Sequence, residues 1–457
     1  GSVLTIENNA ALRQVNDMAT NTGNIVVKRN ASVMNRLDYT AWSSPVSGQQ
    51  LQAFSPNTVS TRFYEYLYTG TTTPTAYQSV NPLTNFVAGK GYMIRADNTY
   101  TGPTVFNGQF SGVPFNGIIN QNIGTGVNVL GNPYASPIDA DVFLEDNTTI
   151  GTLYFWTNTT PASGGSYPQN NFASYTAGAG GVAAFGSAKV PNGIIQTGQG
   201  FYIQTNATTV AEFNNAQRQN ASLSTQFFKT SNTVVEKDRV WLNLNHDNTP
   251  YNQILIAYVD NATIGFDHGI DGKTLNQSKT MLYNIVEDSE HVIQGRPLPF
   301  TDDDIVPLGL KVITTGTYSI SIENQEGLFN TQDIFIKDKS INMIHDLKVS
   351  PYVFTSQDGV FNDRFEIVYK NALLNNNDFV DENAVNIFEN NDVVYINSPK
   401  EFIKEVLVFD LLGRKIYQSS NVNQKEMQIS GLHANNQALI VKIKLVNNQE
   451  LTKKLLF

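Results

Sequence analysis

The candidate metal-binding cluster that stands out most in the sequence is a Gly-rich loop, Asp267-His268-Gly269-Ile270-Asp271-Gly272. Its two carboxylates are four residues apart, and hard cations such as Ca²⁺ need several oxygen ligands on a flexible turn. Calcium is therefore a candidate cofactor, with Asp267 and Asp271 as the candidate metal ligands. The loop departs from the EF-hand pattern because it lacks a third loop ligand and a distal Glu. The alternative is that both aspartates only cap turns of their own loop, a common role of Asp.

Two further acidic groups could do chemistry, but their spacing favours structural roles. Asp139 and Asp141 are two residues apart, so on a strand they would lie side by side and not across a cleft, as glycoside hydrolysis requires. We expect a capping role, because Ser136-Pro137-Ile138-Asp139 is typical of a helix start. The run Asp302-Asp303-Asp304 is typical of a solvated turn, although it could add calcium ligands from a second loop.

The distribution of histidine and cysteine argues against catalysis. All five histidines lie in the second half of the chain, and there is no cysteine: the histidines are His246, His268, His291, His345 and His433. The first half therefore cannot build a Ser-His-Asp triad or a His-ligated metal site alone. Neither HExxH nor GxSxG occurs in the sequence. We expect no catalytic residue and no enzyme activity, and we expect His345 beside Asp346 to be structural.

Aromatic residues near a long polar segment are candidates for sugar binding. Residues 157–190 are rich in Gly, Ser, Ala and Asn, and a loop of this length inside a domain is usually either functional or loosely ordered. Aromatic rings beside Asn and Gln are residue types that stack on sugars and hydrogen-bond to them. The candidate ligand-binding residues are Trp156, Tyr167 and Tyr175. The alternative is a surface flap that packs its own aromatics.

The composition is that of an extracellular β-protein. Only 15% of the 457 residues are charged, and 26 Phe and 20 Tyr make the chain rich in aromatics. The net charge of −10 argues against binding to nucleic acid or to an anionic membrane surface. The missing cysteine excludes disulfides and thiolate chemistry. No apolar run is long enough to span a bilayer, so we expect no membrane span.

The elements that must position these residues are predicted to be strands throughout. Residues 3–30 hold two short strands beside Asn/Gly turns, which favours either the end of a parallel β-helix or a hairpin. A duplication follows over residues 31–225. Trp42-Ser43-Ser44-Pro45 aligns with Leu130-Gly131-Asn132-Pro133, and Gly89-Lys90-Gly91-Tyr92 aligns with Gly198-Gln199-Gly200-Phe201. The repeat predicts two similar sheets that face each other in one pseudo-symmetric domain, with each Gly-x-Gly step forming a turn before a strand.

The second half of the chain predicts two further all-β domains. Residues 226–372 alternate short strands with turn-rich connections, which favours a jelly-roll-like sandwich. Residues 373–383 are Asn-rich and polar, typical of a linker. Residues 384–457 predict an Ig-like sandwich of about seven strands, in which Val441-Lys442-Ile443-Lys444-Leu445 alternates between apolar and basic residues. In its FDLLGRK stretch, Asp410 is expected to cap a hairpin turn that Gly413 closes with a positive φ.

The last 65 residues carry a family resemblance. The stretches VVYINSPKEFIKEVLVFDLLGRKIYQ, QALIVKIKL and LTKKLLF follow one another up to Phe457. In order and spacing they resemble the C-terminal sorting domain of Bacteroidetes type IX secretion cargo, in the variant called type C. The preceding block is similar to the sandwich that commonly precedes such domains. The resemblance implies that Asp410, Gly413, Arg414, Lys453 and Lys454 are sorting-signal residues.

This resemblance also implies where the protein goes and what it meets. The implied partners are the type IX outer-membrane translocon and its shuttle protein, and the implied location is the cell surface or the medium. Gly1-Ser2 is typical of a protease-cleavage scar, so we expect the chain to be the C-terminal part of a longer exported protein. We expect a non-catalytic cell-surface protein of the adhesin or stalk type. The alternative is a carbohydrate-binding module of a secreted glycan-acting protein, with surface glycans as partners.

Overall fold

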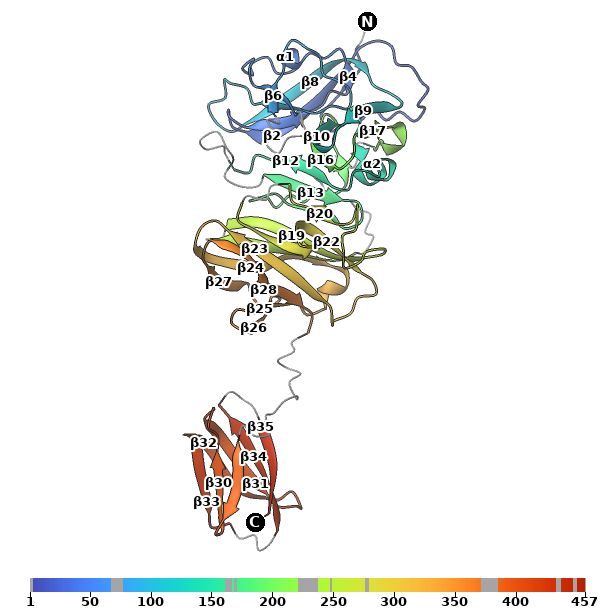
Figure 1. Cartoon of the computed structure of the whole chain (residues 1–457). Coiled ribbons are helices and arrows are strands. Elements are labelled where there is room, and N and C mark those ends of the chain that lie inside the picture. The colour runs from blue at the N-terminus through green and yellow to red at the C-terminus, as the bar shows by residue number, and fades with distance from the viewer. Residues whose placement is uncertain are drawn as a thin grey trace. The chain divides into compact units, whose positions relative to one another are not determined.

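The computed structural model describes most of the chain and divides it into two compact units. The described residues are 3–66, 77–160, 167, 171–220, 237–246, 249–275, 279–370, 385–432, 437–446 and 450–456. The units are Gly1–Lys370 and Asn371–Phe457. Their regular elements are almost all strands, so the expected all-β class is confirmed (Figure 1). The expected linker over 373–383, the expected boundary at residue 225 and His433 lie outside the described residues.

The duplicated region contains two sheets with the same strand order. The first copy has the order β3-β7-β5-β6: Tyr39–Trp42, Tyr92–Arg95, Phe63–Tyr66 and Tyr77–Ser79. The second has the order β10-β16-β12-β13-β14: Gly126–Gly131, Gly200–Thr205, Leu153–Trp156, Phe172–Thr176 and Gly180–Val182. A short helix follows the first strand of each sheet, α1 (Leu51–Phe54) in one copy and α2 (Ala140–Asp146) in the other. The sequence repeat is thus a repeat of topology.

A pair of antiparallel strands completes each copy. In the first copy β2 (Ile25–Met34) pairs with β8 (Thr104–Pro114), and in the second β9 (Ile119–Ile123) pairs with β17 (Thr209–Phe213). The expected boundary at residue 30 therefore falls inside β2. The smaller elements here are β4 (Val46–Ser47), β11 (Ile138–Asp139), β15 (Ile194–Ile195) and the 3-10 helix η1 (Asn215–Gln217).

The N-terminal strand is an edge strand of the first copy. β1 (Thr5–Ile6) pairs in parallel with β2, which in turn pairs with β8. A hairpin would join its two strands antiparallel, so the hairpin alternative for residues 3–30 is wrong. Ile6 is buried with Val27 of β2 in the core of the first copy. The N-terminal segment is therefore part of the repeat's own fold.

Where the two copies meet, two equivalent backbone hydrogen bonds join them. Ser43 N donates to Gly198 O (3.0 Å), and Gly131 N donates to Gly89 O (3.0 Å). In the sequence alignment Ser43 corresponds to Gly131, and Gly198 corresponds to Gly89, so the two bonds are related by exchange of the copies. A buried cluster that includes Tyr154 and Tyr202 fills the space between the two sheets. The predicted pseudo-symmetric pair of facing sheets is what the structure contains.

The segment expected to form a jelly-roll-like sandwich, here called the sandwich, is one eleven-stranded sheet around a large core. Its path is β26-β25-β28-β23-β21-β22-β19-β18-β24-β27, and β20 pairs with β22. In chain order the strands β18 to β28 are Asp238–His246, Thr249–Val259, Gly272–Lys273, Met281–Val286, Ser289–Pro297, Ile305–Val312, Gly316–Glu326, Phe335–Asp338, Met343–Asp346, Tyr352–Ser356 and Gly359–Val368, and the 3-10 helix η3 (Gly327–Asn330) follows β24. Strands from both ends of the path contribute to the same core, for example Ile336 of β25 and Phe354 of β27. The sheet is therefore curled around that core.

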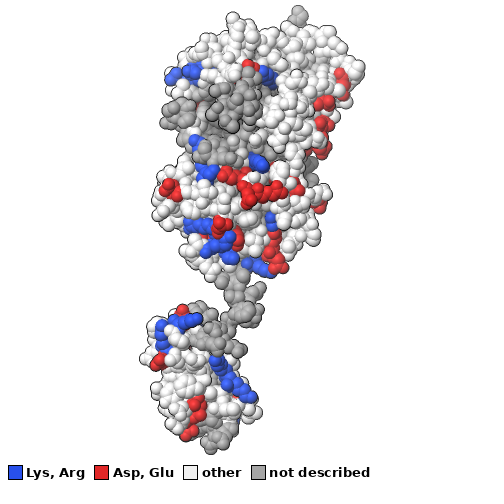
Figure 2. Space-filling view, viewed as in Figure 1, with Lys and Arg blue, Asp and Glu red and all other residues white. Residues whose placement is uncertain are grey.

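The sandwich is joined to the second copy of the repeat by side chains of β18. Trp241 Nε1 donates to Gly181 O (2.8 Å), and Arg239 Nη1 donates to Ala179 O (3.1 Å). Ala179 and Val182 of the repeat also share a buried cluster with Trp241 and other residues of the sandwich. On the face shown in Figure 2 the repeat has few charged side chains, and those of the first unit gather over the sandwich.

The second unit is a small sandwich of seven strands, as expected. Its sheets have the orders β29-β30-β33 (Asn386–Asn390, Val393–Asn397, Glu426–Ser430) and β32-β31-β34-β35 (Lys415–Gln424, Ile403–Phe409, Ala438–Leu445, Glu450–Leu456). Val441, Ile443 and Leu445 are buried, and Lys442 between them is exposed, which confirms the predicted alternation. The buried cluster has members from both sheets, so the unit has its own core. Within the described residues, no helix is long and apolar enough to cross a membrane.

Candidate functional site

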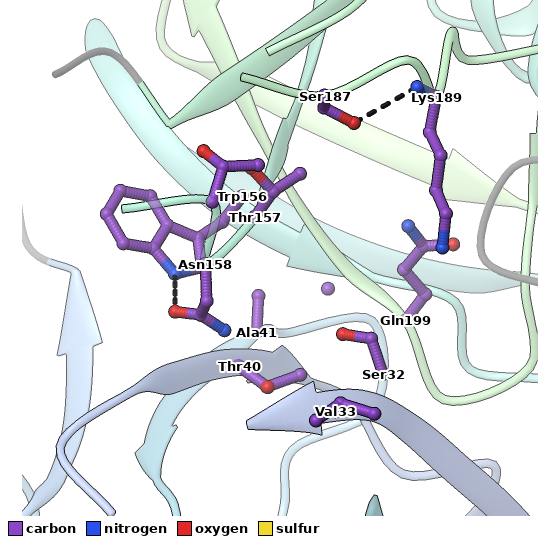
Figure 3. Close-up of a pocket in the computed structure, with 12 residues that line it drawn as sticks. Ser32, Val33, Thr40, Ala41, Trp156, Thr157, Asn158, Ser187, Lys189 and Gln199 are labelled. Atoms are coloured by element: carbon purple, nitrogen blue, oxygen red, sulfur yellow. Dashed lines mark hydrogen bonds between the residues drawn. The ribbon is translucent and has the colours of Figure 1, made fainter. Parts of the chain in front are cut away.

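A cavity of about 320 Å³ lies where the two copies of the repeat meet (Figure 3). The first copy contributes residues of β2 and β3, and the second contributes the end of β12, a following turn, the 187–189 loop and the start of β16. The lining residues are Ser32, Val33, Thr40, Ala41, Trp156, Thr157, Asn158, Thr159, Ser187, Lys189, Gln199 and Gly200. Most of these side chains are polar, and Trp156 supplies the one aromatic ring. The cavity is therefore our candidate ligand site.

Trp156 is held in place by hydrogen bonds and by neighbouring rings. Its Nε1 donates to Tyr39 O (3.0 Å) and to Asn158 Oδ1 (3.2 Å). The rings of Tyr167 and Phe172 pack against it edge-on, with centroid distances of 4.7 and 5.1 Å. The indole N–H is thus fully used by the protein. Its apolar ring surface is what remains for a ligand.

Gln199 is the most buried polar side chain of the cavity, with 4% of its surface exposed. Its Oε1 accepts from Gln196 N (2.9 Å), which fixes the orientation of the amide. No described residue accepts from its Nε2, and Figure 3 shows Gln199 and Lys189 on the same side of the cavity, opposite Trp156. The amide N–H₂ is therefore free to donate to a ligand or to water in the cavity.

The pseudo-symmetric position in the first copy is occupied by an ion pair. The pairing registers match Gln199 to Lys90, Trp156 to Tyr66 and Phe155 to Glu65. Lys90 pairs with Glu65, so its charge is compensated within the protein. The substitution of Gln for Lys and of Phe for Glu removes this pair from the second copy. The repeat is therefore symmetric in its backbone and asymmetric in its polar groups.

The structure places the three predicted aromatic ligand residues differently. Trp156 lines the cavity, and Tyr167 packs against Trp156 while its carbonyl oxygen accepts from Lys279 Nζ (2.9 Å). Tyr175 is buried, and its hydroxyl donates to Asp141 Oδ1 (2.7 Å). A buried ring offers no face for a sugar to stack on, so Tyr175 as a ligand-binding residue is wrong.

The candidate calcium ligands are engaged with the backbone of their own region. Asp267 Oδ1 accepts from Thr263 Oγ1 (3.1 Å), and the two oxygens of Asp271 accept from Asp267 N and Gly295 N, both at 2.7 Å. Burial raises the pKa of Asp271 to about 6. Across the described ranges, no group of three or more His, Asp or Glu side chains could hold a metal ion. These hydrogen bonds fit the alternative prediction for the loop, in which Asp267 and Asp271 cap turns.

A second cavity of about 290 Å³ lies beside this loop, between the second copy and the sandwich. Its lining residues are Thr149, Gly151, Thr152, Tyr154, Gln204, Thr205, Asn206, Ala207, Phe266, His268, Asp271 and Lys273. Tyr154 donates to Lys273 O (2.9 Å), and Lys273 Nζ lies 5.3 Å from the centroid of the Phe266 ring. The contacts lock the loop against the repeat.

The remaining acidic and histidine candidates have structural partners. Asp139 caps α2, since its Oδ1 accepts from Asp141 N (2.9 Å), which confirms the predicted capping role. Asp304 accepts from Tyr258 Oη (2.7 Å) and Arg296 Nε (2.9 Å). His345 Nε2 lies 2.8 Å from Ser350 O.

The predicted sorting-signal residues of the second unit fall into two groups. Asp410 closes the hairpin between β31 and β32: its carboxylate accepts from the backbone N of Leu412 (3.0 Å) and of Arg414 (2.9 Å), and from Arg414 Nε (2.6 Å). These bonds, that of the Arg414 backbone foremost, lower the pKa of Asp410. Gly413 has φ +78°, as expected for the turn. The second group lies on β35, where Lys453 Nζ donates to Val385 O (3.0 Å) and Lys454 pairs with Ile440.

Most residues of the first cavity carry no recognisable signal in the sequence. Ser32, Thr40, Lys189 and Gln199 come from four separate segments, and no motif joins them. The one available signal was the alignment of the copies, in which Gln199 replaces Lys90.

Comparison with known proteins gives family matches for nearly the whole chain. A model described as "Domain of unknown function (DUF8693)" matches residues 1–369, and one described as "Domain of unknown function (DUF8694)" matches residues 374–457. No curated protein matches the sequence. A solved structure titled "Biofilm associated protein - BSP domain" aligns with 98% of this chain and 67% of its own at 8% identity, and its TM-score of 0.13 is too low to indicate a shared fold. Because the first model spans 369 of the 457 residues, the chain belongs to the family described as a domain of unknown function (DUF8693).

Proposed function

We propose that this protein is a non-catalytic, secreted cell-surface protein of the adhesin or stalk type, whose second unit directs its export through the type IX secretion system. The observation that carries the proposal is that the sorting-like sequence coincides with a separate compact unit, Asn371–Phe457, with its own core. A unit of this kind can act as a signal whatever precedes it in the chain. The partners would be the outer-membrane translocon and its shuttle protein.

The hairpin that carries the sorting motif suits recognition. Leu411 and Leu412 at its tip are 61% and 80% exposed, and the Asp410 carboxylate fixes the turn that presents them. Exposed apolar side chains on a rigid turn are a typical protein-binding feature. Arg414 adds a charge beside them, because its side chain is 73% exposed.

A reporter fusion tests the export role. A signal peptide, a fluorescent reporter and residues 371–457 would be expressed in a Bacteroidetes cell with the secretion system, and we expect the reporter to be accessible to protease outside the cell. Arg414→Ala should lower export while the unit stays folded, because the backbone N–H groups that cap the turn remain. Retention of the unaltered fusion in the periplasm would refute the export role.

We propose as a second candidate function that the first unit binds glycans in the Trp156 cavity. The observation that favours it is a fixed tryptophan ring opposite polar side chains in one cavity, the combination that recognises a sugar's apolar face and its hydroxyls. A glycan array probed with residues 1–370, with calcium and again with chelator, tests it. Binding that Trp156→Ala abolishes in both conditions supports this site. Binding lost only on chelation would move the site to the Asp267–Asp271 loop.

A further inference from the structure

We infer that the Trp156 cavity takes an acidic saccharide, whose carboxylate or sulfate group is held by Lys189 and Gln199 while its ring lies against Trp156. The inference rests on the proposed glycan-binding role and names the class of sugar. It is based on a comparison of the cavity's polar atoms: some already have a hydrogen-bond partner in the protein, and others do not.

The amide oxygens of the cavity are occupied by the protein's own donors. Asn158 Oδ1 accepts from Trp156 Nε1 (3.2 Å) and, at 3.4 Å, from Tyr39 N. Gln199 Oε1 accepts from Gln196 N (2.9 Å). A ligand that mainly offers donors would therefore find few strong acceptors here, since the hydroxyl oxygens that remain are weaker than amide oxygens.

The free polar groups of the cavity are an amide N–H₂, which can only donate, and hydroxyls, which can donate or accept. Gln199 Nε2 donates to no described residue, although the side chain is 96% buried. The hydroxyl of Ser32 has no hydrogen bond within the described part of the chain, and that of Thr40 makes only a long contact to Met34 Sδ (3.6 Å). These donors line the cavity and are not used by the protein, so the cavity is complementary to a ligand that offers acceptors.

The cavity has one charged lining residue, and that residue is basic. Lys189 is exposed, and no described carboxylate pairs with it. At the pseudo-symmetric position Lys90 is neutralised by Glu65, so the cavity differs from its counterpart by an uncompensated charge. An ammonium group and an amide N–H₂ that line the same cavity match the oxygens of a carboxylate or sulfate through charge-assisted hydrogen bonds.

The position of Trp156 and the volume of the cavity suit the ring of a bound sugar. Figure 3 shows Trp156 on one side of the cavity and Lys189 with Gln199 on the other. The volume of about 320 Å³ is at the small end of ligand pockets, which run from about 300 to 1,000 Å³, and suits one sugar unit of a chain. The ring would thus pack on the indole while its acidic substituent meets the donors opposite.

Titration calorimetry with three probes tests the inference. Residues 1–370 would be titrated with a hexamer of mannuronic acid, a sulfated carrageenan hexamer and neutral mannohexaose. We expect an acidic probe to bind at least about tenfold more tightly than the neutral one, the order of one charge-assisted hydrogen bond. The stronger of the two acidic probes identifies the group, carboxylate or sulfate.

Two variants locate the binding. Lys189→Met should lower the affinity for the acidic probe about tenfold. It should also make this affinity depend less on salt concentration. Gln199→Glu keeps the oxygen that accepts from Gln196 N but replaces the donor with a charge, so it should abolish acidic binding. Lys28→Met is the matched control, because it removes a lysine that pairs with Glu7 away from the cavity.

The outcomes separate this inference from the role on which it rests. Equal binding of neutral and acidic probes, or acidic binding that Lys189→Met leaves unchanged, overturns the acidic specificity and leaves glycan binding standing. If none of the three probes binds, both the specificity and the glycan-binding role of this cavity are refuted.

Discussion

His291 shows how burial sets the chemistry of a single residue in this protein. Its side chain is fully buried on β22, its Nδ1 lies 3.1 Å from Ser289 O, and its Nε2 has no hydrogen-bond partner in the described part of the protein. Burial lowers the pKa of His291 from 6.5 to about 4. The ring is thus kept neutral, which suits a core position and not a catalytic or metal-binding one.

The lowered pKa of His291 predicts that this residue destabilises the first unit in mild acid. Between pH 6.5 and 4 the unfolded chain takes up a proton at His291 that the folded chain refuses, so the free energy of unfolding falls as pH falls, by up to about 3 kcal/mol. Asp271, whose pKa is raised, acts in the opposite direction between about pH 6 and 4. Urea unfolding of residues 1–370 at pH 7 and 4.5 measures the sum.

The variant His291→Phe isolates the histidine, because it leaves Asp271 unchanged. We expect the change in the free energy of unfolding from pH 7 to pH 4.5 to be more favourable in the variant than in the original protein by about 2 kcal/mol or more. An identical loss in both proteins would mean that His291 is protonated in the folded state without cost.

Among the structural elements, the Gly-x-Gly step of each copy lies directly at the contact between the two sheets. Its first glycine has a positive φ, +76° at Gly89 and +72° at Gly198. Its second glycine lies against the other copy: a Cβ on Gly91 would come within 2.6 Å of Val129 Cγ1, and would also meet Leu130 O. The sequence predicted the turn, while the close approach between copies became visible only in the folded structure.

We predict that Gly91→Ala destabilises the first unit by about 1–3 kcal/mol, because the added methyl group forces the two sheets apart. Gly102→Ala is the control, since a Cβ there meets nothing within 4 Å and the backbone is not in the left-handed region. Thermal unfolding of the two variants measures the difference. Equal midpoints would show that the contact between the two copies accommodates the added methyl group without a loss of stability.

The sequence predicted the features that depend on neighbouring residues, and it did not predict those that depend on residues far apart in the chain. Strand alternation, the Asp410 turn and the capping role of Asp139 rest on neighbouring residues and could be predicted. The repeat was visible because its glycines and aromatics recur in order. The cavity was not visible, because Ser32 and Gln199 are 167 positions apart and meet only when the copies pack. Tyr175 was misassigned since a buried and an exposed tyrosine look alike in sequence.

At the scale of the whole first unit, the repeat and the sandwich form one compact unit and not two separate domains. Trp241 is buried in a cluster with Ala179 and Val182 of the repeat, and its Nε1 donates to Gly181 O (2.8 Å). Arg239 reaches the same segment, donating to Ala179 O (3.1 Å). A stable joint of this kind would let the sandwich support the cavity between the two copies, as the proposed stalk role requires.

We therefore predict that residues 1–370 unfold in a single cooperative transition, with calorimetric and van't Hoff enthalpies that agree. Trp241→Phe should lower the midpoint but keep one transition, because it loses the bond to Gly181 O and keeps apolar burial. Trp241→Ala also leaves a hole in the shared cluster and should split the transition in two. Two transitions in the original protein would instead mean that the repeat and the sandwich fold independently, and that the contacts of β18 hold them together without coupling their stabilities.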